Sequence, residues 1–163
     1  MDKTREEHIS GIVRRYGDLL YRTSFVLLKN EKDAEDAVQE TLIEYMNTGV
    51  RFEGEEHEKA WLLRVAVNKS KDLLRYRARH PLLEESAEAR TSTSDGTVAS
   101  SPVLDALLTL PEKYRLALTL HYVEGYNVKE TAQIMHLTGS AVKMRLKKGR
   151  ELLKAAYRKE IGL

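Results

Sequence analysis

The chain of 163 residues contains no cysteine. It therefore has no disulfide framework and no thiolate metal site, which fits a reducing compartment such as the cytoplasm. No apolar run approaches the length that is needed to span a bilayer. Residues 1–7 are polar and lack the apolar core of a signal peptide. We therefore expect a cytoplasmic protein that is not inserted into a membrane.

The usual marks of a catalytic or cofactor site are also missing. The five histidines are scattered, and none of them belongs to a metal-ligand spacing such as His-Glu-x-x-His. No glycine-rich phosphate loop follows a strand, because the sequence contains no convincing strand. We expect no catalytic residue, no cofactor and no metal, and hence a protein that is not itself an enzyme.

The net charge is only +2, but the charged residues are unevenly distributed. Residues 1–46 carry 7 basic and 10 acidic side chains, residues 47–80 carry 8 and 5, residues 81–103 carry 1 and 4, and residues 104–163 carry 11 and 6. Two basic blocks are therefore separated by an acidic stretch. This pattern favours two contact surfaces for one polyanion, with an acidic surface left for a protein partner.

Helical periodicity dominates the first 80 residues. Apolar residues recur at helical spacing from about residue 6 to about residue 29, which predicts a first helix. Asn30 is suited to cap the next helix, with Asp33 as its partner three residues on. The inward face of that helix is predicted to hold Ala34, Ala37, Val38, Leu42 and Tyr45. Asp36, Gln39 and Glu40 form an exposed i, i+3, i+4 patch that suits a basic partner.

A loop is predicted from Thr48 to Glu58, because this stretch contains two glycines and four glutamates. The helix after it starts near Glu58 and is apolar almost all round from Trp61 to Val67, which implies burial on several sides. Asn68 interrupts the apolar run, either as a hydrogen-bonded core residue or as a residue facing the loop. The same helix then becomes strongly basic through Lys69, Lys71, Arg75, Arg77 and Arg79.

From about Leu82 to Pro102 the sequence is rich in Ser, Thr, Ala, Glu and Gly and has no apolar period. This composition predicts a flexible linker, with a short helix around Leu83–Arg90. We therefore predict an all-α protein of two small helical domains. The N-terminal domain would span residues 1–80, the linker residues 81–103 and the C-terminal domain residues 104–163.

The stretch Leu110–Arg158 predicts three helices, of which the last two form a helix-turn-helix. Pro111 suits a first helical turn, and Gly125 suits a left-handed helix end. Asn127 and Glu130 have the spacing of a capping box for the second helix. Together these residues mark where the first two helices begin and end.

Ala132 is small where two helices must cross, His136 stands at the bend where a glycine is common, and Thr138 can cap the last helix.

The last helix has one apolar face, and its other faces are strongly basic. The apolar face of that helix is predicted to hold Val142, Leu146, Leu153 and Ala156. Its other faces carry Lys143, Arg145, Lys147, Lys148, Arg150 and Lys154. Such a helix suits a major groove flanked by phosphates, although any basic helix hairpin would share part of the pattern.

Three segments resemble, in order, those of bacterial sigma factors. Asp33–Leu42 resembles the segment that grips core RNA polymerase, and Trp61–Arg75 resembles the helix that melts and reads the minus-ten promoter element. Leu110–Arg115, followed by Glu130–Ala132 and Val142–Leu146, resembles the helix-turn-helix that reads the minus-thirty-five element. The order, the spacing and the short linker are similar to those of extracytoplasmic-function (ECF) sigma factors, the minimal two-domain group of the sigma-70 family. The resemblance covers residues 9–78 and 104–158.

The resemblance implies a subunit that directs promoter-specific transcription initiation. Contact with the clamp helices of the largest polymerase subunit would fall to Asp36, Gln39 and Glu40. The loop Asn47–His57 matches one that takes a flipped-out base. Minus-ten DNA would be contacted by Asn68, Lys69, Lys71 and Arg75. The minus-thirty-five element would be read by Ser140, Lys143, Met144 and Lys147, with phosphate contacts from Arg145, Lys148 and Arg150.

The resemblance further implies an anti-sigma factor among the partners, besides core RNA polymerase and promoter DNA. The sequence leaves two other interpretations open. One is a dimeric helix-turn-helix regulator that does not depend on core polymerase, and the other is a helical adaptor without a DNA role. The acidic patch and the Trp61–Arg75 block argue against the first, and the charge distribution argues against the second.

Overall fold

The computed structural model describes residues 3–81 and 101–163, and every regular element within these ranges is a helix. The predicted all-α fold is therefore confirmed. The chain separates into two compact units, Met1–Arg90 and Thr91–Leu163, each with its own core. The helix predicted around Leu83–Arg90 and the flexibility predicted for the linker lie outside the described residues.

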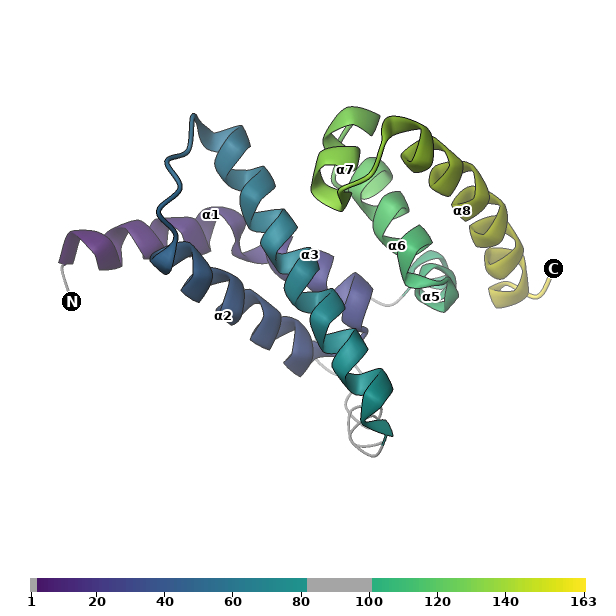
Figure 1. Cartoon of the computed structure of the whole chain (residues 1–163). Helices are drawn as coiled ribbons and strands as arrows, with labels where there is room; N and C mark the ends of the chain where they lie inside the picture. The colour runs from purple at the N-terminus through teal and green to yellow at the C-terminus, as the bar shows by residue number, and fades with distance from the viewer. Residues whose placement is uncertain (1–2, 82–100) are drawn as a thin grey trace. The chain divides into compact units, whose positions relative to one another are not determined.

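The first unit consists of three helices, each of which contacts the other two (Figure 1). These helices are α1 (Lys3–Leu28), α2 (Glu31–Asn47) and α3 (Glu55–Arg79). Leucines of α1 and α3 fill the core, namely Leu20, Leu27, Leu62 and Leu63. Each such leucine contributes roughly 1.5–3 kcal/mol through burial. Ala34 and Ala37 give α2 a small inner face, so its backbone can lie close to the leucines.

A two-residue connection joins α1 to α2. Lys29 adopts a left-handed φ of 56°, and its N–H donates to the carbonyl of Phe25 at 2.7 Å, which ends α1. The Asn30 side chain then accepts from the N–H of Asp33 at 2.9 Å, so the predicted cap of α2 is confirmed. Because both residues are tied to the adjoining helices, α2 leaves α1 in a defined direction.

The loop between α2 and α3 is shorter than predicted. It runs over residues 48–54, since Asn47 is the last residue of α2 and α3 begins at Glu55 rather than near Glu58. Three of the glutamates that suggested a loop, Glu55, Glu56 and Glu58, lie in the first turn of α3. Negative side chains are favourable there because the first turn carries the positive end of the helix dipole.

Five helical segments make up the described part of the second unit: α5 (Pro102–Thr109), α6 (Glu112–Leu118), the π-helical turn η1 (Thr119–Val123), α7 (Val128–Met135) and α8 (Gly139–Glu160). Helix α5 was not predicted, because its start was read as the end of the linker. The Ser101 side chain caps it by accepting from the N–H of Leu104 at 3.1 Å, with Pro102 in the first turn. Helix α5 packs against α8, as α6 does.

The helix that starts after Pro111 ends in a wide turn. The N–H of Glu124 donates to the carbonyl of Thr119 at 2.9 Å, five residues back, which is the bonding pattern of a π-helix. Gly125 follows with a φ of 80°, so the predicted left-handed glycine is confirmed. The wide turn carries Tyr122 to the surface, where its side chain is 56% exposed.

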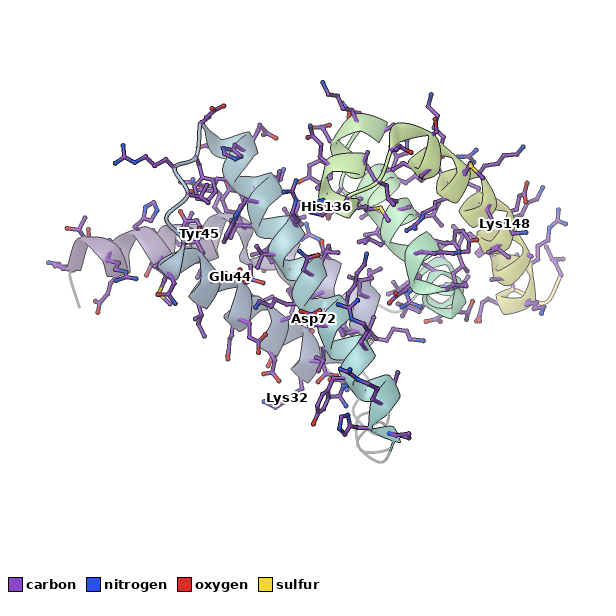
Figure 2. The ribbon with its side chains drawn as sticks, viewed as in Figure 1. Lys32, Glu44, Tyr45, Asp72, His136 and Lys148 are labelled. Atoms are coloured by element: carbon purple, nitrogen blue, oxygen red, sulfur yellow. The ribbon has the colours of Figure 1, made fainter. Side chains whose placement is uncertain are left out.

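The helix-turn-helix is confirmed in α7 and α8. The side chains and backbones of Asn127 and Glu130 bond reciprocally at 2.8 and 3.0 Å, which completes the capping box. Thr138 caps α8 through the N–H of Ala141 at 3.1 Å. His136 turns the chain between the two helices in a left-handed conformation, with φ 56° and ψ 47° (Figure 2).

The inner face of α8 is only partly as predicted. Val142 and Leu146 are buried, whereas Leu153 and Ala156 are half-buried. Gly149 is also buried, and a Cβ atom added there would lie 3.1 Å from the side chain of Leu118 in α6. No sequence pattern indicated this close approach, which fixes the distance between α8 and α6.

We predict that His136→Gly stabilises the protein by about 0.5–1 kcal/mol. The left-handed conformation costs a residue with a Cβ atom about 1–2 kcal/mol, and the greater freedom of glycine in the unfolded chain offsets about 0.4–1 kcal/mol of that gain. Urea unfolding measures the change. The control Ala155→Gly, on the exposed side of α8, should destabilise by about 1 kcal/mol. A loss of stability in His136→Gly would contradict the strain argument.

Candidate functional site

The acidic patch predicted on α2 is exposed. Gln39 and Glu40 are solvent-exposed, and Asp36 is half-exposed beside Lys32, with 3.8 Å between Nζ and Oδ1. Such an exposed ion pair contributes little to stability, so Asp36 can exchange Lys32 for another cation at low cost. Ile43, 51% exposed, follows Gln39 and Glu40 by one helical turn. The sequence analysis did not single out this apolar side chain, which suits the contact surface of a partner helix.

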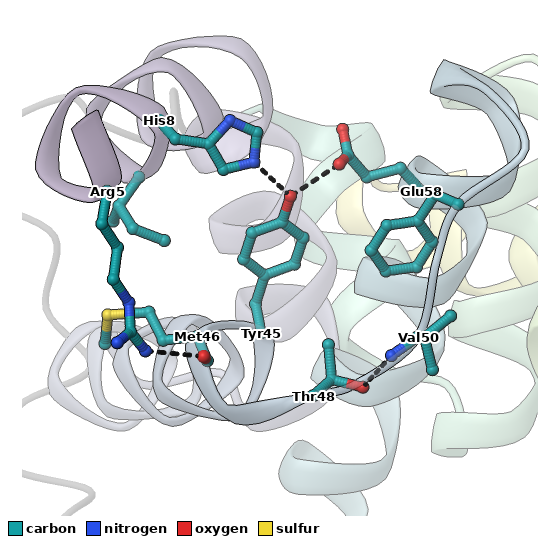
Figure 3. A pocket seen from close by; sticks show the side chains of 9 residues that line it. Arg5, His8, Tyr45, Met46, Thr48, Val50 and Glu58 are labelled. Atoms are coloured by element: carbon teal, nitrogen blue, oxygen red, sulfur yellow. Dashed lines mark hydrogen bonds between the residues drawn. The ribbon is translucent and has the colours of Figure 1, made fainter.

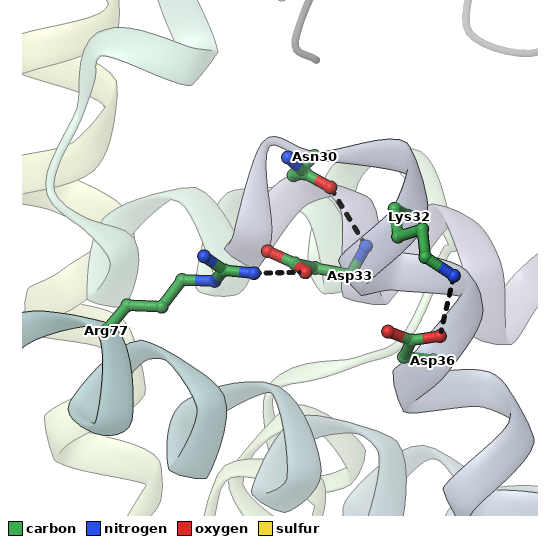
Figure 4. Close-up of polar contacts among 5 residues, drawn as sticks. All are labelled: Asn30, Lys32, Asp33, Asp36 and Arg77. Carbon is green, nitrogen blue, oxygen red and sulfur yellow. Dashed lines mark hydrogen bonds and ion pairs between the residues drawn. The ribbon is translucent and has the colours of Figure 1, made fainter. Parts of the chain in front are cut away.

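Asp33, one helical turn before Asp36, has a different environment (Figure 4). Its carboxylate is buried, and Oδ1 accepts from Nη2 of Arg77 at 2.5 Å. This contact joins the first turn of α2 to the last turns of α3. The sequence analysis placed Arg77 in the basic run of α3. Its contact with Asp33 shows that it has a structural role.

The predicted minus-ten residues differ in their surroundings. Asn68 is exposed, which excludes the core position that was considered for it. Lys69 forms an ion pair with Glu44 of α2, with 3.2 Å between Nζ and Oε2. Arg75 pairs with Asp72 on its own helix, and Lys71 is half-exposed. The basic surface of α3 is therefore partly neutralised by neighbouring acids.

A pocket of about 390 Å³ lies beside the loop between α2 and α3 (Figure 3). The ends of all three helices contribute to it, with Arg5 and His8 from α1, Tyr45 from α2 and Glu58 from α3. The Tyr45 hydroxyl donates to Oε2 of Glu58 at 2.6 Å and lies 2.9 Å from Nε2 of His8. Arg5 donates through Nη2 to the carbonyl of Met46 at 2.7 Å. Sequence reasoning did not identify Arg5, His8 and Tyr45 as residues of a pocket, because only the fold brings α1 to this loop.

Aromatic contacts tie the loop to the core. Phe52 stacks on Tyr45 with 5.8 Å between ring centroids, and the edge of Trp61 meets both rings at 5.6 and 6.0 Å. Trp61 is half-buried rather than buried as the apolar pattern implied. Burial raises the pKa of the Tyr45 hydroxyl, and the hydrogen bond to Glu58 adds to the rise. Tyr45 therefore stays protonated and remains a hydrogen-bond donor at neutral pH.

The outer face of α8 presents most of the predicted minus-thirty-five residues to solvent. The exposed members are Ser140, Lys143, Met144, Lys147, Lys148 and Arg150, whereas Arg145 is half-buried. Met144, the apolar residue of this group, is 73% exposed. Arg150 donates through Nη1 to the hydroxyl of Tyr122 at 2.9 Å. Tyr122 therefore orients one of the predicted phosphate contacts.

Residues 3–81 and 101–163 show neither a membrane-crossing helix nor a cluster of metal ligands. None of the helices there has both the length and the apolar character of a membrane crossing. In the same two ranges, no three His, Cys, Asp or Glu side chains converge in a way that would hold a metal ion. The surfaces that stand out are the acidic face of α2, the α3 surface with its adjoining pocket, and the outer face of α8.

Comparisons with known proteins match both units. Residues 12–80 match the family described as sigma-70 region 2, and residues 100–153 match the family described as sigma-70, region 4. The ECF RNA polymerase sigma factor SigW of Bacillus subtilis is 28% identical over 173 residues, which cover 96% of this chain and 92% of SigW. The ECF RNA polymerase sigma-E factor of Haemophilus influenzae is 30% identical over 164 residues, 91% of this chain and 80% of the relative.

Two solved structures share the fold. The sigma factor RpoE in complex with the anti-sigma factor NepR, from Bartonella quintana, has a TM-score of 0.75 at 20% identity, over 93% of this chain and 98% of that chain. CnrH in complex with the cytosolic domain of CnrY has a TM-score of 0.66 at 26% identity, over 92% and 87%. The likeness therefore extends over both units.

We predict that Asp33→Asn destabilises the first unit by about 2–3 kcal/mol, because it removes the charge of a buried carboxylate that bonds the half-buried Arg77. Thermal unfolding measures the effect. Asp36→Asn removes a carboxylate from the same helix at an exposed position and should change stability by no more than about 0.5 kcal/mol. Equal effects of the two substitutions would show that burial does not distinguish the two pairs.

Proposed function

The chain belongs to the ECF sigma factors of the sigma-70 family, and on that basis we propose that it directs core RNA polymerase to promoters by reading two DNA elements. The N-terminal domain, residues 1–80, would bind polymerase and read the minus-ten element. The C-terminal domain, residues 104–163, would read the minus-thirty-five element. The observation that carries the proposal is the coexistence, in one chain, of an exposed acidic helix face, a basic helix beside a pocket, and a basic recognition helix.

The outer face of α2 is the surface proposed for core polymerase. Asp36, Gln39 and Glu40 offer carboxylates and an amide to a basic partner, and Ile43 adds an apolar contact in line with them. We propose the clamp helices of the largest polymerase subunit as that partner. Because the acids are exposed and only weakly paired, their desolvation on binding is offset by new charge pairs.

The loop over residues 48–54 and the adjoining surface of α3 are proposed to hold the minus-ten element as single strand. A base that is read in this form must leave the stack, which costs a few kcal/mol. The pocket beside the loop offers aromatic walls for such a base, and Lys71 and Arg75 offer charges to its backbone. The ion pairs Lys69–Glu44 and Arg75–Asp72 would open to accept phosphates.

The outer face of α8 is proposed to enter the major groove of the minus-thirty-five element. Ser140, Lys143 and Lys147 stand one helical turn apart and can reach base edges together with Met144. Lys148 and Arg150 would meet phosphates, and the hydroxyl of Tyr122 orients the guanidinium of Arg150. Arg145, which is half-buried, can reach only a phosphate close to the helix.

An anti-sigma factor is the proposed regulatory partner. The Bartonella quintana RpoE and CnrH were both solved with a protein bound, the anti-sigma factor NepR and the cytosolic domain of CnrY. A protein that covers the α2 and α8 surfaces of this chain would block polymerase and DNA together. We propose that the chain acts in the cytoplasm, where polymerase and promoters are found.

Run-off transcription tests the proposed function. Purified full-length chain and bacterial core polymerase should together produce discrete transcripts from genomic fragments, and neither should do so alone. A dimeric helix-turn-helix regulator, the alternative from the sequence, would bind duplex DNA without polymerase and give no new transcript with core enzyme. The family matches over both regions do not favour that alternative.

We predict that Asp36→Lys combined with Glu40→Lys weakens core binding by about tenfold or more, because it places cations against a basic partner. Fluorescence titration with core polymerase at near-physiological salt measures the affinity. The control Glu6→Lys with Glu7→Lys makes the same charge change on the exposed start of α1 and should leave core affinity unchanged. If the α2 variant keeps its affinity for core polymerase and has a normal circular dichroism spectrum, this face is excluded as the polymerase-binding surface.

We predict that Lys143 and Lys148 have separable roles on α8. Lys143→Ala should change the preferred minus-thirty-five sequence, by about 1–3 kcal/mol if the amine bonds a base edge. Lys148→Ala should weaken all promoters alike and reduce the slope of log affinity against log salt by about one unit. Holoenzyme binding to a promoter panel at several salt concentrations measures both. Equal, sequence-independent losses would contradict the division.

A further inference from the structure

One end of the pocket beside the loop over residues 48–54 offers a hydrogen-bond acceptor to a ligand. The Tyr45 hydroxyl gives its proton to Oε2 of Glu58 at 2.6 Å, so its oxygen must accept from His8, whose Nε2 lies 2.9 Å away. His8 therefore carries a proton on Nε2. The Glu58 carboxylate accepts through both of its oxygens. This end of the pocket thus offers the Glu58 carboxylate as an acceptor to a ligand.

The rest of the pocket is mostly apolar, with the cationic Arg5 and the hydroxyl of Thr48, which accepts from the N–H of Val50 at 3.3 Å. Ile9, Val50 and Phe52 line it, and the ring of Phe52 is parallel to that of Tyr45, with an angle of 1° between the planes. Arg5 is held at the C-terminal end of α2 by its bond to the carbonyl of Met46, and its guanidinium has further donors. A flat ligand that carries an N–H donor at one edge and an acceptor elsewhere fits these walls (Figure 3).

We propose that this pocket binds a flipped-out base with an exocyclic amino group and rejects thymine. The inference rests on the proposed function, because it assumes that promoter single strand reaches the loop. Cytosine presents an amino donor where thymine presents the carbonyl oxygen O4. The amino group can donate to Glu58, whereas O4 would face the carboxylate as a second acceptor and leave both oxygens unpaired. Helix α1 takes part in the selection through His8, which fixes the Tyr45–Glu58 bond.

Cytosine and thymine are similar in size, so comparing them isolates the chemistry of this one edge. Promoters that differ only by cytosine or thymine at each minus-ten position would be transcribed with holoenzyme made from the full chain. The initial run-off rate should favour cytosine over thymine by about tenfold at one position. Glu58→Gln should bring that ratio close to one, because the amide offers both a donor and an acceptor, and it should leave the other positions unchanged.

Glu55→Gln is the matched control. Glu55 lies in the same helical turn, its side chain is 77% exposed and it pairs with Arg15 rather than lining the pocket. It should leave every cytosine-to-thymine ratio unchanged. The second variant, His8→Phe, keeps a ring over Tyr45 but removes the donor, and it should lower the ratio at the same position by about threefold. Melting temperatures of the variants show whether each is folded.

The outcomes separate the inference from the proposed function. If the parent holoenzyme gives no promoter-dependent transcript, the proposed function fails. If it transcribes but prefers thymine at every minus-ten position, or if Glu58→Gln and His8→Phe both fold and leave every ratio unchanged, the assignment of the pocket is overturned. If Glu58→Gln does not fold, the ratio measured with His8→Phe decides alone, since that variant keeps the Glu58 carboxylate and removes only the donor that orients Tyr45.

Discussion

The first unit depends on two polar contacts that hold α2 against α3 at opposite ends. At one end the buried carboxylate of Asp33 accepts from Arg77, and at the other the hydroxyl of Tyr45 donates to Glu58. Between them α2 and α3 pack against each other, with Ala34 and Ala37 of α2 and Ala66 and Val67 of α3 buried. Apolar packing alone would allow α2 to slide along α3, whereas a directional bond at each end defines the register. The surfaces of this unit that are proposed for polymerase and for DNA therefore keep a fixed relation.

The second unit reaches the same rigidity by different means. Its helices other than α8 are short, and its turns are defined by capping side chains and by residues with positive φ at Gly125 and His136. Close packing of Gly149 on Leu118 then determines how near α8 lies to α6. A recognition helix must present several side chains to base edges at once, so a shift of its axis would disturb all of them together. In this unit much of the constraint lies in backbone geometry, and the buried guanidinium of Arg115 adds to it by donating to the carbonyl of Leu110 between α5 and α6.

Much of this architecture can be predicted from local sequence. Asn30, Asn127 and Thr138 cap helices as expected, since a capping residue acts within three positions of itself. The family resemblance is likewise confirmed, because both sigma-70 regions match in the expected order. The start of α3 was placed too late, since glutamates favour exposed loops and first helical turns alike.

What could not be predicted involves residues far apart in the chain. The Asp33–Arg77 pair spans 44 positions and the His8–Tyr45 contact spans 37, and no periodicity relates their members. The pocket was missed for this reason, although the loop beside it was singled out. The roles assigned to individual residues on α2, α3 and α8 follow from resemblance and exposure, and they stay predictions.

Charged residues of one type serve different purposes in this chain according to their burial. Arg77 and Arg75 are neighbours on α3, and each pairs with an aspartate, but only the partner of Arg77 is buried. An exposed pair is worth about 0–1 kcal/mol, so Arg75 can leave Asp72 for a phosphate with little loss. Arg77 cannot leave Asp33 without stranding a buried carboxylate. Binding of a polyanion would therefore draw on the exposed pairs first, and the fold that positions them would survive the exchange.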